Sequence, residues 1–221
     1  MADFLPLVRR SYLTVYNWTV FIGWFQVLYL ALKTLKDSGH GYVYHATEKP
    51  LLLAQSTAVL EILHGLLGLV RSPITATVPQ ISSRLFVTWG VLWSFPETRT
   101  HLLVSLLVIS WSITEIIRYS FFGTKEAFGF APSWIMWLRY STFLFLYPIG
   151  ISSEVGLIYF ALPYIKESGK YSMRMPNKLN FSLDSFYIAI LVLGIYFPGS
   201  SHMYTYMIGQ RTRALSKLKK V

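Results

Sequence analysis

The stretch YLTVYNWTVFIGWFQVLYLAL, residues 12–32, contains no charged side chain and decides the class of fold. A helix needs about 20 mostly apolar residues to cross a bilayer, and this stretch has that length. It is too long for the apolar part of a signal peptide, and no small-residue cleavage site follows it. The stretch is therefore predicted to remain as a first membrane crossing.

The composition extends this prediction to the whole chain of 221 residues, because 53% of them are hydrophobic and only 14% are charged. The charged share is roughly half that of a soluble domain. Further apolar runs predict six crossings in all, at residues 12–32, 51–70, 74–95, 101–122, 134–165 and 181–208. Short loops join them, so we expect a single domain, residues 1–221, forming an all-α antiparallel membrane helix bundle. Pro148 is expected to kink the fifth helix.

The charge balance and the missing cysteines narrow the range of functions. Twenty Lys and Arg against ten Asp and Glu give a net charge of +10. In a membrane protein such an excess is typical of loop bias and lipid headgroups, so we expect no nucleic-acid partner. A modest excess of basic residues on the side of the two termini predicts that both are cytosolic. Because the chain has no cysteine, disulfides, thiolate metal sites and thiol nucleophiles are excluded.

Several ionisable residues lie inside the apolar runs, where each costs about 2.5–3.5 kcal/mol and is usually turned toward the bundle interior. Glu115 and Arg118 have the i, i+3 spacing of an internal ion pair, although contact with a substrate phosphate is an alternative. Glu61 and His64 repeat the spacing and are predicted to form a hydrogen-bonded polar pair. A metal site is not predicted there, because a second E-x-x-H motif is missing.

The run YPIGISSE, residues 147–154, carries the most informative polar residues. Tyr147 and Glu154 are i, i+7 and so return to nearly the same helix face, while Ser152 and Ser153 between them leave room for a ligand. Tyr147 also fits the role of an interfacial aromatic residue. Glu154 has no basic residue one turn away, so its charge is met by another helix or removed by protonation. A carboxyl beside a phenol suits proton transfer.

Four motifs resemble one enzyme family: YPIGISSE (147–154), WSITEIIRYSFF (111–122), LRYSTFLFLYP (138–148) and LEILHGLLGLVRSPI (60–74). The family is that of the very-long-chain (3R)-3-hydroxyacyl-CoA dehydratases, once called protein tyrosine phosphatase-like proteins, and the wording is closest to plant members. The resemblance implies a six-crossing endoplasmic reticulum protein that forms trans-2-enoyl-CoA in fatty-acid elongation. It implies that Tyr147 and Glu154 are catalytic. Phosphatase activity is rejected, since such enzymes need a thiolate.

Dehydration requires a base for the C2 proton and an acid for the departing C3 hydroxyl. We assign Glu154 as base and Tyr147 as acid, although the sequence equally permits the reverse. Ser152, Ser153 or backbone groups freed near Pro148 are candidate donors to the thioester oxygen. No cofactor is expected, because no redox change occurs. Candidate cations for the CoA phosphates, each also typical of a headgroup contact, are Arg118, Lys125, Arg84 and Arg71.

Expected partners are the acyl-CoA substrate, membrane lipid and the other elongation-cycle enzymes, namely ketoacyl-CoA synthase, ketoacyl-CoA reductase and enoyl-CoA reductase. A transporter or channel is an alternative, against which the chain has no inverted repeat. A non-catalytic scaffold for an elongase assembly is another. The last residues, Lys-Leu-Lys-Lys-Val at 217–221, resemble a dilysine signal for return to the endoplasmic reticulum, or else anchor the tail to anionic lipid.

Overall fold

The computed structural model describes residues 4–70, 74–173 and 182–218. Throughout these residues the regular elements are helical, as the composition predicts. In chain order they are α1 (Phe4–Asp37), η1 (His40–Tyr42), α2 (Val43–Thr57), α3 (Val59–Leu66), α4 (Ile74–Leu85), η2 (Phe86–Trp93), η3 (Pro96–Thr98), α5 (Leu102–Phe128), α6 (Ser133–Ser141), α7 (Phe143–Ser168) and α8 (Ser185–Leu218). Most of the long helices extend beyond the apolar runs, because their polar flanking residues continue the helix.

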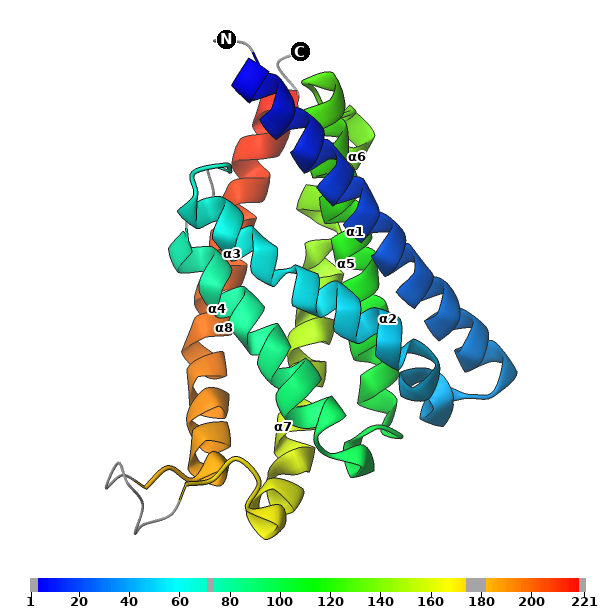
Figure 1. Cartoon of the computed structure of the whole chain (residues 1–221), viewed down its shortest axis with the longest axis vertical. Coiled ribbons are helices and arrows are strands. Elements are labelled where there is room, and N and C mark those ends of the chain that lie inside the picture. Colours follow the sequence, from blue (N-terminus) through cyan, green and yellow to red (C-terminus); the bar gives the residue numbers. More distant parts are fainter. Residues whose placement is uncertain (1–3, 71–73, 174–181, 219–221) are drawn as a thin grey trace.

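Figure 1 shows α5, α7 and α8 running roughly along the long axis, α1 and α2 inclined to it, and the start of α1 and the end of α8 at the same end of the molecule. In the described part of the chain, four helical stretches are long and apolar enough to cross a membrane: Leu5–Asp37, Leu102–Phe128, Phe143–Ser168 and Ser185–Ser216. The other two predicted crossings, 51–70 and 74–95, are each divided into two shorter elements. The described residues therefore confirm an all-helical fold with four candidate membrane spans.

A contact from α1 explains why the predicted crossing 51–70 is divided. The helix breaks at Ala58, and the hydroxyl of Tyr16 donates a hydrogen bond to the Thr57 carbonyl at 3.1 Å. The Thr57 carbonyl therefore has a hydrogen-bond donor at the break, although that donor comes from another helix. After α3 the chain turns at Gly68, which has a φ of +68°, a conformation that glycine adopts without strain.

The predicted crossing 74–95 changes character halfway along. The α-helix α4 ends at Leu85, and η2 continues it as a π-helix from Phe86 to Trp93. Arg99 caps the end of η2, since its Nε donates to the Leu92 carbonyl at 2.8 Å and its Nη2 to the Trp93 carbonyl at 2.7 Å. Short π-helical segments are rare and are frequent at functional sites.

The predicted crossing 134–165 is also two helices, α6 and α7, which meet at Thr142. The Thr142 carbonyl accepts hydrogen bonds from the amides of both Phe145 and Leu146, at 3.2 and 3.0 Å. Beyond this junction α7 continues as one helix through Pro148 and Pro163. The break thus lies before Pro148, and the predicted kink at that proline stays a prediction.

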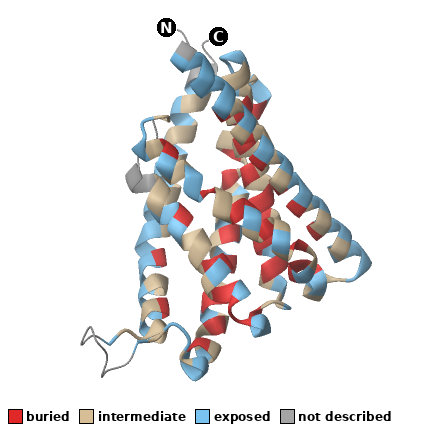
Figure 2. Ribbon diagram, in the orientation of Figure 1, coloured by how far each residue is buried: buried red, intermediate tan, exposed pale blue. Residues whose placement is uncertain are grey.

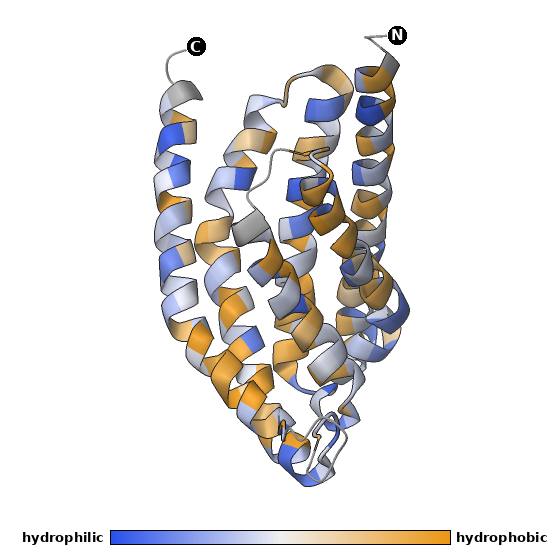
Figure 3. Ribbon diagram, turned by 60° about the vertical axis from the view of Figure 1, so that its left-hand side comes forward, coloured by the Kyte–Doolittle hydropathy of each residue, from blue (hydrophilic) through white to orange (hydrophobic). Residues whose placement is uncertain are grey.

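The core lies around α5, which packs between α1 and α7, while α8 packs against α7 and α6. In Figure 2 the buried residues gather along α5 and α7 and on the inner side of α1 and α2, whereas α8 is mostly exposed. Gly123 of α5 permits the close approach of α1, because a Cβ there would lie 3.0 Å from Nε1 of Trp18. Figure 3 shows that the apolar part of α8 is the half nearer its start, and that the half nearer the C-terminus is hydrophilic.

Candidate active site

Glu154 lies in the middle of α7 and is almost completely buried, with 4% of its surface exposed. Its Oε1 accepts a hydrogen bond from Nε1 of Trp111 on α5 at 2.9 Å. Its Oε2 accepts one from the hydroxyl of Tyr196 on α8 at 2.6 Å. Three helices therefore hold this carboxyl group through two neutral donors, which fix the positions of both oxygens.

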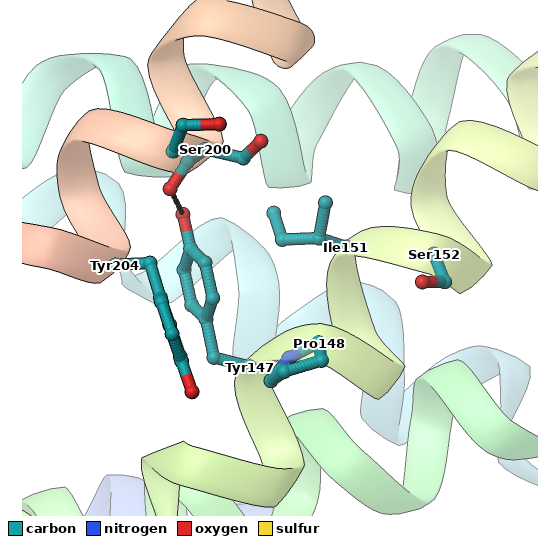
Figure 4. Close-up of a pocket in the computed structure, with 7 residues that line it drawn as sticks. Tyr147, Pro148, Ile151, Ser152, Ser200 and Tyr204 are labelled. Carbon is teal, nitrogen blue, oxygen red and sulfur yellow. Dashed lines mark hydrogen bonds between the residues drawn. The ribbon is translucent and has the colours of Figure 1, made fainter.

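Tyr147 lies two turns before Glu154 on α7 and also faces α8. Its hydroxyl donates to the backbone carbonyl of Ser200 at 3.3 Å, and its ring stacks on that of Tyr204 with centroids 5.9 Å apart. Figure 4 shows these side chains around a shallow pocket. The pocket has a volume of about 220 Å³ and is lined by Tyr147, Pro148, Ile151, Ser152, Ser200, Ser201 and Tyr204. Glu154 is not among these lining residues, so the two predicted catalytic side chains share the α8 side of α7 without lining one cavity.

The two serines between Tyr147 and Glu154 differ in their surroundings. Ser153 is buried, and its hydroxyl donates to the carbonyl of Ile149 at 2.8 Å, one turn back in its own helix. Ser152 is exposed and lines the pocket beside Tyr147. Of the two candidate donors to a thioester oxygen, Ser152 is therefore the one that faces open space.

A separate cluster of charges surrounds Glu115 of α5, which is 2% exposed. Its carboxylate forms ion pairs with Arg84 of α4 and with Arg118, whose Nε lies 3.0 Å from Oε2. This confirms the ion pair predicted from the i, i+3 spacing. Arg118 also pairs with Glu61 of α3, and the hydroxyl of Tyr119 donates to the same Glu61 oxygen. We call these five residues the charge network.

The prediction that Glu61 and His64 form a hydrogen-bonded pair is wrong, because each residue binds other partners. Glu61 binds Arg118 and Tyr119, whereas Nε2 of His64 lies 2.8 Å from the hydroxyl of Tyr12 on α1. A guanidinium is a stronger partner for a carboxylate than a neutral imidazole, so the approach of α5 redirects Glu61. Within the described residues no three His, Asp or Glu side chains lie close enough together to hold a metal ion.

Arg84 connects the charge network to Glu154. Besides its ion pair with Glu115, its guanidinium lies 5.6 Å from the centre of the Trp111 ring, and Trp111 is the residue that donates to Glu154. A cation over an aromatic face contributes about 0.5–2 kcal/mol. The network therefore fixes the position of the indole that in turn orients Glu154.

The candidate cations for CoA have unequal access. Arg84 and Arg118 are committed to buried carboxylates. Lys125 is exposed on the last turns of α5, beside the start of α1, where Arg10 donates to the carbonyls of the adjacent residues Glu126 and Ala127 at 2.5 and 2.7 Å. Arg71, Lys219 and Lys220 lie outside the described residues.

Sequence reasoning missed Trp111 and Tyr196, the two side chains that touch Glu154. A signal for Trp111 exists, because Trp111, Glu115 and Arg118 follow i, i+4, i+7 and share one face of an apolar helix. Tyr196 has no comparable signal, since it lies 42 residues from Glu154 in the sequence. Only the packing of α8 on α7 brings the phenol to the carboxylate.

Comparison of the sequence with known proteins identifies the family to which the chain belongs. The family described as "Protein tyrosine phosphatase-like protein, PTPLA" matches residues 55–217. The chain is 73% identical to "Very-long-chain (3R)-3-hydroxyacyl-CoA dehydratase PASTICCINO 2" of Arabidopsis thaliana, over 100% of both chains. It is 70% identical to PASTICCINO 2A of Oryza sativa subsp. japonica, named as the same dehydratase, over 99% of each chain.

A more distant relative, "Very-long-chain (3R)-3-hydroxyacyl-CoA dehydratase 2" of Homo sapiens, is 41% identical over 95% of this chain and 82% of its own length. No solved structure matches the chain. The family match covers most of the sequence, including the parts of α5, α7 and α8 that hold Glu154. The chain belongs to the protein tyrosine phosphatase-like family, PTPLA, together with these named dehydratases.

Proposed function

We propose that this protein is a hydro-lyase that dehydrates very-long-chain (3R)-3-hydroxyacyl-CoA to trans-2-enoyl-CoA in fatty-acid elongation. The relatives at 70–73% identity over essentially the whole chain are named for this activity. The observation that carries the assignment to a site is the buried Glu154 carboxylate, whose two hydrogen-bond donors are both neutral. A carboxylate that is buried and not neutralised by a directly bonded cation is suited to exchange a proton.

Glu154 is assigned as the base that removes the C2 proton. Trp111 and Tyr196, which are both neutral, donate to its two oxygens. They also orient the carboxylate, since three helices fix its position. General-base catalysis by a positioned carboxylate is worth about 10²–10⁴-fold in rate.

Tyr147 is assigned as the acid that protonates the leaving C3 hydroxyl. Its hydroxyl is at the edge of a pocket and is held only by a long hydrogen bond of 3.3 Å to the Ser200 carbonyl. A substrate hydroxyl arriving in the pocket would replace this bond without leaving a buried donor unpaired. Ser152, on the same pocket wall, is the proposed donor to the thioester oxygen as negative charge develops there.

The CoA part is proposed to lie toward the end of the bundle where α1 begins and α8 ends. Tyr147 is near the start of α7, on this side of Glu154, and Lys125 is exposed at the same end. Lysine is a common partner for phosphate groups. Arg84 and Arg118, whose charges are matched by Glu115 and Glu61, are proposed to support the site and not to bind phosphate.

We propose a six-crossing arrangement in the endoplasmic reticulum membrane, as one domain with both termini cytosolic. The start of α1 and the end of α8 lie at one end of the molecule, which fits an even number of crossings (Figure 1). In this arrangement α2 with α3, and α4 with η2, form two broken crossings. Broken helices are tolerated at membrane depth where neighbouring helices satisfy the backbone, as Tyr16 does for Thr57. The other enzymes of the elongation cycle are the proposed protein partners.

The test is direct. The full chain, purified in detergent, is incubated with 3-hydroxypalmitoyl-CoA and with 3-hydroxylignoceroyl-CoA, each as separate (3R) and (3S) forms, and enoyl-CoA is measured by mass spectrometry. The expected result is enoyl-CoA from the (3R) forms and its absence with a Glu154→Gln variant. A folded wild-type preparation that forms no enoyl-CoA from any of them would exclude the dehydratase.

A further inference from the structure

A second pocket lies at the opposite end of α7 from Tyr147. It has a volume of about 320 Å³, lies between η2, α7 and α8, and is lined by Phe86, Trp89, Gly90, Trp93, Phe95, Ile165, Lys170, Tyr171, Ser185 and Ile188. Most of its wall is aromatic or aliphatic. Gly90 contributes to the space, because it offers no side chain on the η2 wall.

The pocket lies along the same helix seam as the candidate active site. One face of α7 carries residues at alternating intervals of four and three, namely Tyr147, Ile151, Glu154, Ile158, Ala161 and Ile165. The first two line the pocket beside Tyr147, and the last lines the second pocket. Both pockets also include residues of α8. A ligand that begins at Tyr147 and follows this face passes Glu154 and reaches the second pocket, and on the way it must displace the packing around Ile158 and Ala161, which are fully buried.

The polar groups at the far end of the pocket are engaged with one another. The ammonium group of Lys170 donates to the Ser94 carbonyl at 3.1 Å and lies 5.4 Å from the centre of the Phe95 ring. The hydroxyl groups of Tyr171 and Ser94 are 2.9 Å apart. These contacts hold Lys170 and Tyr171 at the end of the pocket, and the aromatic and aliphatic remainder of the wall is suited to hydrocarbon.

The distance along α7 relates the pocket to chain length. Glu154 and Ile165 are 11 residues apart, about 16 Å at 1.5 Å per residue, or roughly half of the 30 Å hydrocarbon thickness of a bilayer. Half a bilayer is the depth that one acyl chain of an ordinary membrane lipid fills. A chain of that length with its C3 atom at Glu154 ends near Ile165, and further methylenes need additional room.

We propose that the pocket between η2, α7 and α8 binds the distal methylenes of the acyl chain and sets the chain length that the enzyme accepts. The proposal rests on the proposed function, since it places the reacting carbons at Glu154. Ile188 on the α8 wall and Trp93 on the η2 wall both line the pocket and are the two side chains chosen to change its size.

The test uses the full chain in detergent and the kcat/KM ratio for (3R)-3-hydroxylignoceroyl-CoA over (3R)-3-hydroxypalmitoyl-CoA. Ile188→Phe narrows the pocket and is expected to lower this ratio about tenfold, the scale on which apolar pockets discriminate. Trp93→Ala widens it and is expected to raise the ratio. The matched controls are Ile190→Phe on an exposed face of α8 and Trp134→Ala on α6, which should leave the ratio unchanged.

The outcomes separate the pocket from the function. An unchanged ratio in both pocket variants, or a shift in the same direction, would overturn the proposal and assign the pocket to a membrane lipid chain. If Ile188→Phe does not fold, the proposal is tested by Trp93→Ala alone: a raised kcat/KM ratio supports it, and an unchanged or lowered ratio overturns it. Wild-type protein that turns over neither substrate would instead overturn the proposed dehydratase function itself.

Discussion

Two buried carboxylates, Glu115 of α5 and Glu154 of α7, have similar burial and opposite surroundings. Glu115 is paired with the guanidinium groups of Arg84 and Arg118, whereas Glu154 accepts hydrogen bonds from an indole and a phenol. Because two guanidinium groups neutralise the Glu115 carboxylate, it is poorly suited to exchange a proton. Glu154 is held by neutral donors, so its carboxyl group is available to exchange a proton. The comparison separates a carboxylate that holds the bundle together from one that is available for chemistry.

The difference also predicts different consequences for mutations near Glu115 and near Glu154. Breaking a buried ion pair by removing one partner costs about 3–5 kcal/mol, because the remaining charge is left uncompensated. Losing one neutral donor to a charged group costs about 1.5–3 kcal/mol. Changes around Glu115 should therefore appear mainly as lost stability, and changes around Glu154 mainly as lost turnover. The predictions below test this contrast.

The largest effect is expected at Tyr147. Tyr147→Phe keeps the ring and its stacking on Tyr204 but removes the proposed acid, so kcat should fall by about 10²–10⁴-fold with little change in the melting temperature. Turnover of (3R)-3-hydroxypalmitoyl-CoA measures it. Tyr204→Phe is the matched control in the same pocket, and it should retain activity within about tenfold. Equal losses in the two variants would remove Tyr147 from the chemistry.

The next effect concerns the charge network. Arg84→Met removes one guanidinium from Glu115 and should lower the free energy of unfolding by about 3–5 kcal/mol. Glu48→Gln is the control, because it removes a partly exposed ion pair with Arg99 whose charged atoms are 3.8 Å apart, and such a pair is worth about 0–1 kcal/mol. Denaturation in detergent measures both. Similar losses for the buried and the exposed pair would contradict a structural role for the network.

A smaller effect is expected at the donors to Glu154, which we treat as positioning residues. Tyr196→Phe removes a hydrogen bond to the Glu154 carboxyl group and should lower kcat about tenfold to a hundredfold while KM changes little, since this hydroxyl is bonded to the carboxyl group that it orients. Trp111→Phe should act in the same way on the other oxygen. A rise in KM at unchanged kcat would mean that the two residues bind substrate and do not orient the carboxylate.

The smallest effect is expected from a change at the C-terminal tail, of which residues 219–221 lie beyond the described residues. Two alanines added after Val221 shift Lys217, Lys219 and Lys220 relative to the C-terminus without changing charge. If a receptor reads these positions, a fluorescently tagged variant should leave the endoplasmic reticulum while keeping full activity. Unchanged residence would assign retention to the membrane segments or to protein partners.

The sequence predicted what depends on neighbouring residues. Apolar runs predicted the helices, and the i, i+3 spacing predicted the pair of Glu115 and Arg118. It did not predict the break at Ala58, which needs Tyr16 from another helix, or the contact of Tyr196 with Glu154, which needs the register of α7 against α8. Both depend on packing between segments that are far apart in the chain. Helix ends were misplaced for a simpler reason, since polar flanking residues extend a helix without changing hydropathy.

The central claim is that Glu154 performs chemistry and Glu115 maintains structure. Both carboxylates are changed to the isosteric amide, and for Glu154→Gln and Glu115→Gln the melting temperature and kcat are measured on the same preparations. The account predicts that Glu154→Gln melts near the wild-type temperature with kcat lowered by about 10²–10⁴-fold, and that Glu115→Gln is strongly destabilised. A Glu154→Gln variant that retains near-normal turnover, or that unfolds as readily as Glu115→Gln, would contradict it.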